Sequence, residues 1–524
     1  MASTSYDHVI VGGGHNALAA AVHLSAHGRS VIVLEANKRV GGAAATQEVT
    51  LPGYRHDLAA MNLSLFAGSP FAQAYGPKLA EHGLAYAPVS DCFANPFPDG
   101  RWLGISNDLE KNASRIAAFD SADAERWRAM TEAFSEDAPH YFALLGTPMR
   151  LRPLLRLAVK TLRAKGRPWT VDAIRLLLAS PREFLDENFN SPHLKATLAP
   201  WAMHLDFPPD ASGGALFPYL ESMADQAFGM VLGKGGASVI PQALEGLLKA
   251  TGGEVRTGTT ATSIEVNAGR AVAVKSDDGE VFRAKEAILA SLTPQSLLAM
   301  VGSTGKAPTD AALKGWKHGP GTMMIHIACD ALPPWTAGEE LQKFAYVHLA
   351  PTLALLSQTY AQATEGLLPA EPGIVVGQPT AIDPSRAPDG KHVLWLQVRV
   401  VPATILGDAA GEISAHEWSE AKEAMADRVM AILERYAPGV SGSVLARTVH
   451  SPQDLEAFNR NLVGGDSLGG SHHLRQNFML RPAFGMAGHR TPIKGLYHIG
   501  SSTWPGAGVG AGSGYLAAKD IVGG

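Results

Sequence analysis

Cysteine is almost absent from this chain of 524 residues. The only two cysteines, Cys92 and Cys329, lie far apart and form no C-x-x-C pair. They cannot build a dithiol redox centre or a structural zinc site, because both need closely spaced thiolates. His472 and His473 are adjacent, but no carboxylate or histidine recurs near them at the spacing of metal ligands. We therefore expect no metal, and any redox chemistry must depend on another kind of cofactor.

Charge is scarce as well. Charged residues make up 18% of the chain, against about 25% in ordinary globular proteins. The formal net charge of -5 creates no field that would attract nucleic acid, so we expect no nucleic-acid partner. A chain of this length and low charge has room for a large interior that can hold a cofactor and an apolar substrate.

Long apolar runs are also missing. A membrane span needs about 20 predominantly apolar residues. The longest charge-free stretch, residues 344–364, contains Pro351 and many polar residues. The first apolar run has no basic segment before it and is broken at once by Gly12 to Gly14, which is not the pattern of a signal peptide. These features predict a cytoplasmic protein without a transmembrane helix.

The first 35 residues carry a clear structural pattern. Residues 8–11 form a short β-branched run that ends in three glycines, and an Ala- and Leu-rich helical pattern follows over residues 15–26. A second apolar run at residues 31–34 ends at Glu35. Together these segments predict a β-α-β unit of the kind that begins a Rossmann-type α/β domain.

The glycine turn in this unit fits the G-x-G-x-x-G/A pattern of dinucleotide sites. Gly12 permits the tight turn, Gly14 lets the backbone approach a pyrophosphate, and Ala17 allows the helix to pack closely on the strand. The free N–H groups and positive end of the helix favour phosphate. Glu35 is placed to accept hydrogen bonds from ribose hydroxyls. The predicted site residues in this unit are Gly12, Gly14, His15, Asn16, Ala17, Glu35 and Ala36.

Two further segments favour FAD over NAD. Paired glycines shortly after the acidic residue let the chain pass close to a second ligand surface, as an extended FAD requires. Near the C-terminus, residues 495–500 are followed by a glycine-rich turn and an Ala-rich helix from about residue 513 to 522. The N-terminus of that helix would stabilise the negative charge that develops on a reduced isoalloxazine. These segments add Arg39, Gly41, Gly42, Ala43, Gly500, Ser501, Gly508, Val509 and Gly510 to the predicted FAD site.

Residues 6–46, 235–294 and 459–522 resemble the phytoene-dehydrogenase-like FAD-dependent oxidoreductases. This family includes carotenoid desaturases, carotenoid isomerases, retinol saturases and the pyridine nucleotide-disulphide oxidoreductase domain-containing proteins. The motifs at residues 12–16, 41–46 and 464–466 are most similar to the last branch. Carotenoid enzymes commonly carry an arginine after the paired glycines, where this chain has Ala43. The resemblance implies that the same glycines touch FAD and that Val255 contributes backbone to the adenine site.

The predicted fold is a Rossmann-type FAD-binding domain, without a separate NAD domain, interleaved with a mixed α+β substrate lobe. Residues 70–230 show helical patterns separated by prolines, and residues 254–292 show alternating strands with a Ser-Asp-Asp-Gly turn at 276–279. We assign the FAD-binding domain to residues 1–69, 231–299 and 441–524. The substrate-binding lobe takes residues 70–230 and 300–440.

No second G-x-G-x-x-G unit appears in the middle of the chain, where a glutathione-reductase-type enzyme keeps its NAD domain. We therefore expect dehydrogenation of a lipophilic or partly apolar small molecule by hydride transfer to flavin, with oxygen or a quinone as acceptor. A redox-neutral isomerase or saturase of an isoprenoid and a non-catalytic FAD-retaining interaction protein stay open. No catalytic base is identified. The candidates to line the site are His56, Asp57, His204 and Trp504.

Two other patterns suggest different roles. The segment Gly465-Asp466-Ser467-Leu468-Gly469 matches the G-x-S-x-G turn of serine hydrolases. A hydrolase is not favoured, because no convincing buried strand precedes this segment. Residues 149–182 carry nine cations against one acid, with leucines interleaved. Such a helix can lie on an anionic membrane surface, and a solvated helix face is the alternative.

Overall fold

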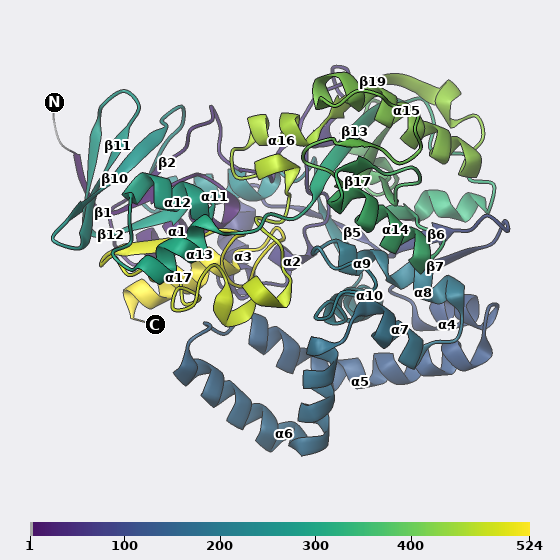
Figure 1. Cartoon of the computed structure of the whole chain (residues 1–524), viewed down its shortest axis with the longest axis horizontal. Coiled ribbons are helices and arrows are strands. Elements are labelled where there is room, and N and C mark those ends of the chain that lie inside the picture. Colours follow the sequence, from purple (N-terminus) through teal and green to yellow (C-terminus); the bar gives the residue numbers. More distant parts are fainter. Residues whose placement is uncertain (1–3, 524) are drawn as a thin grey trace.

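Two seven-stranded sheets lie side by side in the computed structural model, which describes residues 4–523 (Figure 1). The first sheet has the order β10-β11-β12-β1-β2-β9, and its seventh strand, β20, also pairs with β12. Five of its strands run parallel, and β10 and β11 add an antiparallel meander. Its strands are β1 (Thr4–Val11), β2 (Val31–Leu34), β9 (Glu254–Arg256), β10 (Ala261–Asn267), β11 (Arg270–Ser276), β12 (Val281–Ser291) and β20 (Leu496–Ile499).

The first sheet is buried on both faces. Ile10 and Leu289 pack against one cluster of helices, whereas Val9 and Ile288 pack against another. This double burial explains why its parallel strands are continuously apolar instead of alternating. The helices on the first face are α1 (His15–Ala26), α3 (Pro70–Glu81), α11 (Val239–Ala250) and α17 (Gly512–Val522), and those on the second are α12 (Pro294–Val301) and α13 (Ala307–Lys314).

The predicted β-α-β unit is present as β1, α1 and β2. The predicted turn at residues 276–279 joins β11 to β12, and Gly279 takes a positive φ of 84° there. The predicted C-terminal helix is α17. The Rossmann-type fold that the sequence predicts is confirmed, because these elements build a parallel sheet covered by helices on both faces.

The second sheet has the order β19-β13-β17-β16-β14-β6-β7 and is mostly antiparallel. One of its faces packs on α15 (Trp418–Tyr436). Its other face carries Tyr346 and Trp395 toward the helices of the lobe. Its strands are β6 (Asp91–Pro96), β7 (Trp102–Ser106), β13 (Gly321–Cys329), β14 (Tyr346–Leu349), β16 (Ile374–Gly377), β17 (His392–Val401) and β19 (Val444–His450).

Three elements cross the domain division drawn from sequence. α3 and α13 fall within residues 70–230 and 300–440, the segments assigned to the substrate-binding lobe, but they pack on the first sheet. β19 falls within residues 441–524, the segment assigned to the first domain, but it pairs with β13 in the second sheet. The remaining strands form short pairs: β3 (Thr46–Gln47) with β4 (His56–Asp57), β5 (Tyr86–Val89) with β8 (Met230–Gly233), and β15 (Leu367–Leu368) with β18 (Gly407–Asp408).

A helical region lies below the second sheet in Figure 1. None of the helices in residues 4–523 combines the length and apolar character of a membrane span. The helices not yet named are α2 (Ser64–Ala67), α4 (Leu109–Ala117), α5 (Ser121–Leu145), α6 (Leu151–Leu178), α7 (Pro181–Asn188), α8 (Pro192–Leu198), α9 (Pro200–Met203), α10 (Leu216–Phe228), α14 (Leu353–Thr364) and α16 (Pro452–Phe458).

Candidate cofactor site and active site

The carboxyl ends of the parallel strands meet at one edge of the first sheet. Gly12 follows β1, Glu35 follows β2, Ser291 ends β12 and Gly500 follows β20. A Cβ at Gly12 would lie 3.1 Å from the Ser291 carbonyl oxygen, and one at Gly500 would lie 3.1 Å from the Ser291 hydroxyl. Both glycines also take positive φ angles, 90° and 106°. The two glycine motifs are therefore brought together at the edge where open α/β sheets bind ligands.

The N-terminus of α1 is open for an anionic group. Its N-cap, Gly14, provides no side-chain capping hydrogen bond, and no acid lies in the first turn. A Cβ at Gly14 would meet no atom within 4 Å. An uncapped helix start with open space beside it and the positive end of the helix behind it fits the pyrophosphate of a dinucleotide.

Glu35 is buried at the end of β2, where its carboxylate is held by backbone donors. Gly13 N–H donates to one carboxylate oxygen at 2.6 Å, and Asn37 N–H donates to the other at 2.8 Å. Val255 lies beside Val33 in the neighbouring parallel strand β9. Each carboxylate oxygen keeps a lone pair for a ribose hydroxyl. Ala36 and Arg39, predicted at the same site, are exposed.

We expect Glu35→Ala to weaken FAD retention about 10- to 150-fold. The variant loses charge-assisted hydrogen bonds worth about 1.5 to 3 kcal/mol. Equilibrium titration of the apoprotein with FAD measures the change, with Glu339→Ala, an exposed acid on the second lobe, as the matched control. An unchanged dissociation constant would show that Glu35 does not bind the ribose.

The paired glycines pack on the glycine turn itself. Gly41 N–H donates to the Gly13 carbonyl at 2.9 Å, and a Cβ at Gly42 would lie 3.3 Å from the Gly14 Cα. Gly41 and Gly42 both have positive φ angles. The sequence predicts that these glycines let the chain pass close to the cofactor. Their direct contact with the backbone of the glycine turn is a second reason why glycine is needed at both positions. Ala43, the next residue, packs against the apolar core of the second lobe.

The C-terminal segment closes over the start of α1. The His15 ring makes a hydrogen bond to the backbone of Gly508, and burial lowers the pKa of His15 to about 4, so the ring is neutral. Gly514 N–H donates to the Asn16 side-chain oxygen at 3.4 Å. His15 and Asn16, both predicted at the FAD site, therefore join α1 to the glycine-rich C-terminal turn.

Gly508 and Gly510 lie against α2 and not at the first residues of a helix. α17 begins at Gly512, close to the predicted start at about residue 513, so the Gly508-Val509-Gly510 segment precedes the helix. A Cβ at Gly508 would lie 2.5 Å from Leu65, and one at Gly510 would lie 3.3 Å from it. Val509 points into the core beneath the sheet.

Three of the four suggested active-site residues have structural contacts. Asp57 accepts hydrogen bonds from the Thr46 hydroxyl at 2.6 Å and Ala237 N–H at 2.8 Å, and it pairs with the buried Arg386 at 2.8 Å. His56 contacts the Thr50 hydroxyl at 2.8 Å, and burial lowers its pKa to about 3. The buried Trp504 donates to the Thr147 carbonyl. His204, the fourth, lines a small cavity of the second lobe.

Three features of the structure have no counterpart in the predictions from sequence. Asn461 donates to the Ser291 carbonyl at 3.0 Å, so the segment after α16 also reaches the strand ends. Gly514 is the residue at which α17 crosses α1, and its signal is a glycine inside an Ala-rich helix. On α10, burial raises the pKa of both Glu221 and Asp225, one turn apart. No sequence signal separates this buried pair of acids from an exposed one.

The G-x-S-x-G segment is a loop arranged around Asp466. Asp466 accepts hydrogen bonds from Leu468 N–H at 2.8 Å and Gly470 N–H at 2.6 Å. The Ser467 hydroxyl contacts Thr322 at 3.1 Å, and no histidine in residues 4–523 makes a hydrogen bond to it. No strand precedes the segment and no helix follows it, as a nucleophile elbow requires. A hydrolase site is therefore not supported.

Comparison with known proteins agrees with this geometry. The family model for flavin containing amine oxidoreductases matches residues 18–522. The mouse (Mus musculus) pyridine nucleotide-disulfide oxidoreductase domain-containing protein 2 is 30% identical over 98% of this chain and 93% of its own length. The phytoene dehydrogenase of Streptomyces griseus is 26% identical, with coverage of 99% and 95%. A solved oxidoreductase from Methanosarcina mazei shares the fold, with a TM-score of 0.61, 18% identity, and coverage of 99% of this chain and 100% of its own.

The family match spans almost the whole chain and confirms both the predicted resemblance and the predicted cofactor. The open N-terminus of α1, the fixed Glu35 and the glycine turns provide the site at which this chain would hold FAD. The chain belongs to the flavin containing amine oxidoreductase family and is an FAD-dependent oxidoreductase.

Proposed function

We propose that this enzyme dehydrogenates a lipophilic or partly apolar small molecule and passes the electrons to oxygen or a quinone. The main support is the interior of the second lobe. Its largest apolar cluster joins the second sheet to α5 and α10, and it contacts Met61 and Ala43 of the cofactor-binding region. An apolar substrate held along this cluster would lie next to the segment that follows the paired glycines.

The protein residues contribute position and the exclusion of water. When bound, FAD supplies a hydride acceptor. The apolar walls of the lobe would orient the reacting C–H bond and keep water away from it, and such positioning needs no diagnostic catalytic side chain. Because the middle of the sequence lacks a second G-x-G-x-x-G unit, an acceptor such as oxygen or a quinone fits better than a built-in NADPH site.

Anaerobic mixing of the FAD-loaded enzyme with lipid, isoprenoid and amine candidates tests this proposal. We expect one class of compound to bleach the flavin. Its product should have two fewer hydrogens than the substrate and should form in an amount equal to that of the reduced flavin. An isomerase would convert its substrate with no lasting bleaching. If no candidate of any class is altered and none bleaches the flavin, the dehydrogenase proposal fails and the interaction-protein alternative gains support.

We further propose that α6 docks on an anionic membrane surface, from which such a substrate could be taken. α6 forms a bent arm at the edge of the molecule (Figure 1), with its bend at Gly166. None of its residues is buried. Its exposed apolar side chains recur at helical spacing on each half of the arm: Leu151, Leu155, Val159 and Leu162 on the first, and Val171, Ile174 and Leu178 on the second.

The charge of residues 149–182, which comprise α6 and the residues beside it, is smaller than the sequence suggested, because four of the nine cations pair with acids. These pairs are Arg150 with Asp520, Lys165 with Asp137, Arg175 with Glu187 and Arg182 with Asp210. Among the described residues, the remaining five cations form no ion pair: Arg152, Arg156, Lys160, Arg163 and Arg167.

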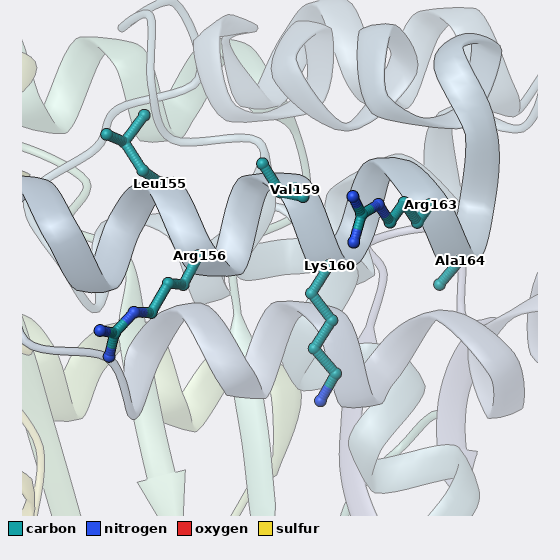
Figure 2. Close-up of a pocket in the computed structure, with 6 residues that line it drawn as sticks. All are labelled: Leu155, Arg156, Val159, Lys160, Arg163 and Ala164. Atoms are coloured by element: carbon teal, nitrogen blue, oxygen red, sulfur yellow. The ribbon is translucent and has the colours of Figure 1, made fainter.

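An anionic lipid surface complements both features of the arm. Leu155 and Val159 point to one side of the helix, whereas Arg156 and Lys160 point to the other (Figure 2). These residues border a shallow, open part of the surface along α6. Cations near an anionic membrane contribute about 1 kcal/mol each, and apolar side chains add burial in the interface. A second copy of this chain offers a net negative charge of only -5 spread over its surface.

We expect the protein to float with phosphatidylserine vesicles at low salt and to be released at high salt. Changing Arg152, Arg156 and Lys160 to Glu should abolish flotation. The matched control changes the exposed Lys306, Lys314 and Arg475 to Glu, with the same change in net charge. If the unchanged protein ignores these vesicles, or if it pairs through α6 into a dimer instead, the membrane proposal is wrong.

A further inference from the structure

A small cavity of about 30 Å³ lies in the second lobe against the face of the sheet that carries Tyr346. Arg399 from β17, His348 from β14 and His204 from the end of α9 contribute its polar groups. Thr359 also lines the cavity and donates its hydroxyl to the Glu371 carbonyl, and most of the remaining wall is apolar, with contributions from Met203, Leu356 and Ile374. A guanidinium and two imidazoles therefore face one space with few polar neighbours.

Arg399 has no acid to balance its charge. Its Nη2 group donates to the Gln397 side-chain oxygen at 2.6 Å, and its Nη1 group donates to the His204 carbonyl at 3.4 Å. Its Nε–H is buried without any partner. It forms no ion pair with any carboxylate of residues 4–523. Burial lowers the pKa of Arg399 to about 10, so the group stays cationic at neutral pH.

The two histidines add further donors without acceptors. Both ring nitrogens of His348 and the Nε2 of His204 are buried and unpartnered. Their ring centroids lie 6.0 Å apart. Burial and the nearby Arg399 lower the pKa of His348 to about 3 and that of His204 well below its usual range. Each neutral ring therefore carries one N–H that can donate to a ligand.

This arrangement is costly unless something accepts these hydrogen bonds. A partly buried cation without an acid and buried donors without acceptors each destabilise a folded protein, and native structures contain few such groups. No carboxylate lines the cavity. A compact anion with two acceptor oxygens would accept these hydrogen bonds and balance the charge of Arg399.

We propose that this cavity is an anion subsite that binds the carboxylate end of the substrate. The inference rests on the proposed function and makes its substrate more specific: an amphiphilic acid with an apolar body. A volume of about 30 Å³ holds about two waters, which is the space of two carboxylate oxygens. A guanidinium is the side chain best matched to a carboxylate, and charge-assisted bonds are about twice as strong as neutral ones.

The position of the cavity suits an anchor for the end of a substrate. The His348 ring stacks on Tyr346, with centroids 6.3 Å apart, and the Tyr346 hydroxyl accepts a hydrogen bond from Asn62 N–H at 3.1 Å. Asn62 lies next to Met61, which contacts the apolar cluster of the lobe. The carboxylate would be held one aromatic ring away from this segment, and the apolar body would follow the cluster toward the cofactor site.

Binding of octanoate and octanol to the FAD-loaded protein tests the subsite, measured by calorimetry and by the fluorescence of Trp201, whose ring lies 5.5 Å from His348. We expect octanoate to bind at least tenfold more tightly than octanol. Arg399→Met should remove this preference and leave octanol binding unchanged, and Arg399→Lys should keep part of it. Arg475→Met, an exposed arginine of the first domain, is the matched control and should bind as the unchanged protein does.

The assay needs no turnover, so its outcome is separate from the flavin-bleaching test of the proposed function. Equal binding of octanoate and octanol would overturn the inference and leave only water in the cavity. Tighter binding of octyl phosphate than of octanoate would overturn the assignment to carboxylates. If Arg399→Met does not fold, His348→Phe provides a second test. This variant keeps Arg399 but fills the cavity with an apolar ring, so it should also remove the preference for octanoate.

Discussion

Replacing Gly514 by alanine is expected to separate α17 from α1 and to release FAD from the protein. A Cβ at Gly514 would overlap the backbone oxygen of Asn16 and would lie 2.7 Å from its carbonyl carbon. The new Cβ would clash with backbone atoms in the first turn of α1, and almost every residue of this helix is buried. Neither helix can shift without disturbing the turn that would hold the pyrophosphate. Overpacking costs about 1 to 3 kcal/mol where side chains can move, and we expect about 3 kcal/mol or more here.

The measurements are FAD content after gel filtration and the midpoint of thermal unfolding. Gly76→Ala is the matched control, because Gly76 lies inside α3 and a Cβ there would meet nothing within 4 Å. The control should be neutral or slightly stabilising, since alanine is the better helix residue by about 0.5 to 1 kcal/mol. A Gly514→Ala protein with normal FAD content and thermal stability would show that the crossing of α1 and α17 is looser than described.

The sequence predicted the cofactor-binding part of the fold because the signals there are local. A strand, a glycine turn and a helix follow one another within 35 residues, and each is specified by its own residues. Glu35 was assigned from its place at the end of β2 alone. The contacts between distant segments could not be predicted in this way. That Gly42 packs on Gly14, or that Asn461 reaches Ser291, depends on how the sheet is assembled.

The second lobe was less predictable for the same reason. The sequence assigns residues 444–450 to the FAD-binding domain, because the pairing of β19 with β13 joins residues more than a hundred positions apart and leaves no local signal. The sequence shows the cations of residues 149–182, but their partners, such as Asp520 for Arg150, come from other elements and have no local signal. One signal was available for Arg399. Arg399 lies on the same face of the apolar strand β17 as Trp395 and Gln397. A charged residue on an apolar strand is rarely buried inside a protein unless it has a partner.

Asp57 and Arg386 provide the second large effect. Both are buried, with exposures of 1% and 0% for the side chains, and their charged groups lie 2.8 Å apart. Asp57 also binds Thr46, four residues after the paired glycines, and Ala237, just before α11. The ion pair therefore fixes the segment that leads from the glycine turn into the second lobe.

We expect Asp57→Asn to lower the free energy of unfolding by about 3 to 5 kcal/mol, because it leaves the Arg386 cation buried without its acid. FAD affinity should fall as well, since the Thr46 segment adjoins Gly41 and Gly42. Arg386→Met in the same protein should restore much of the stability by removing the uncompensated charge. Urea unfolding and FAD titration of both single variants and the double variant give the coupling energy.

Asp408→Asn separates the effect on the cofactor from the effect on folding. Asp408 forms a comparable buried pair with Arg428 at 2.7 Å, but this pair lies in the second lobe between β18 and α15. The control should lose stability and keep its FAD affinity. If Asp57→Asn also leaves FAD affinity unchanged, the pair stabilises the lobe only. If the double variant is no more stable than Asp57→Asn alone, the buried cation is not the source of the loss, and the hydrogen bonds to Thr46 and Ala237 carry the effect instead.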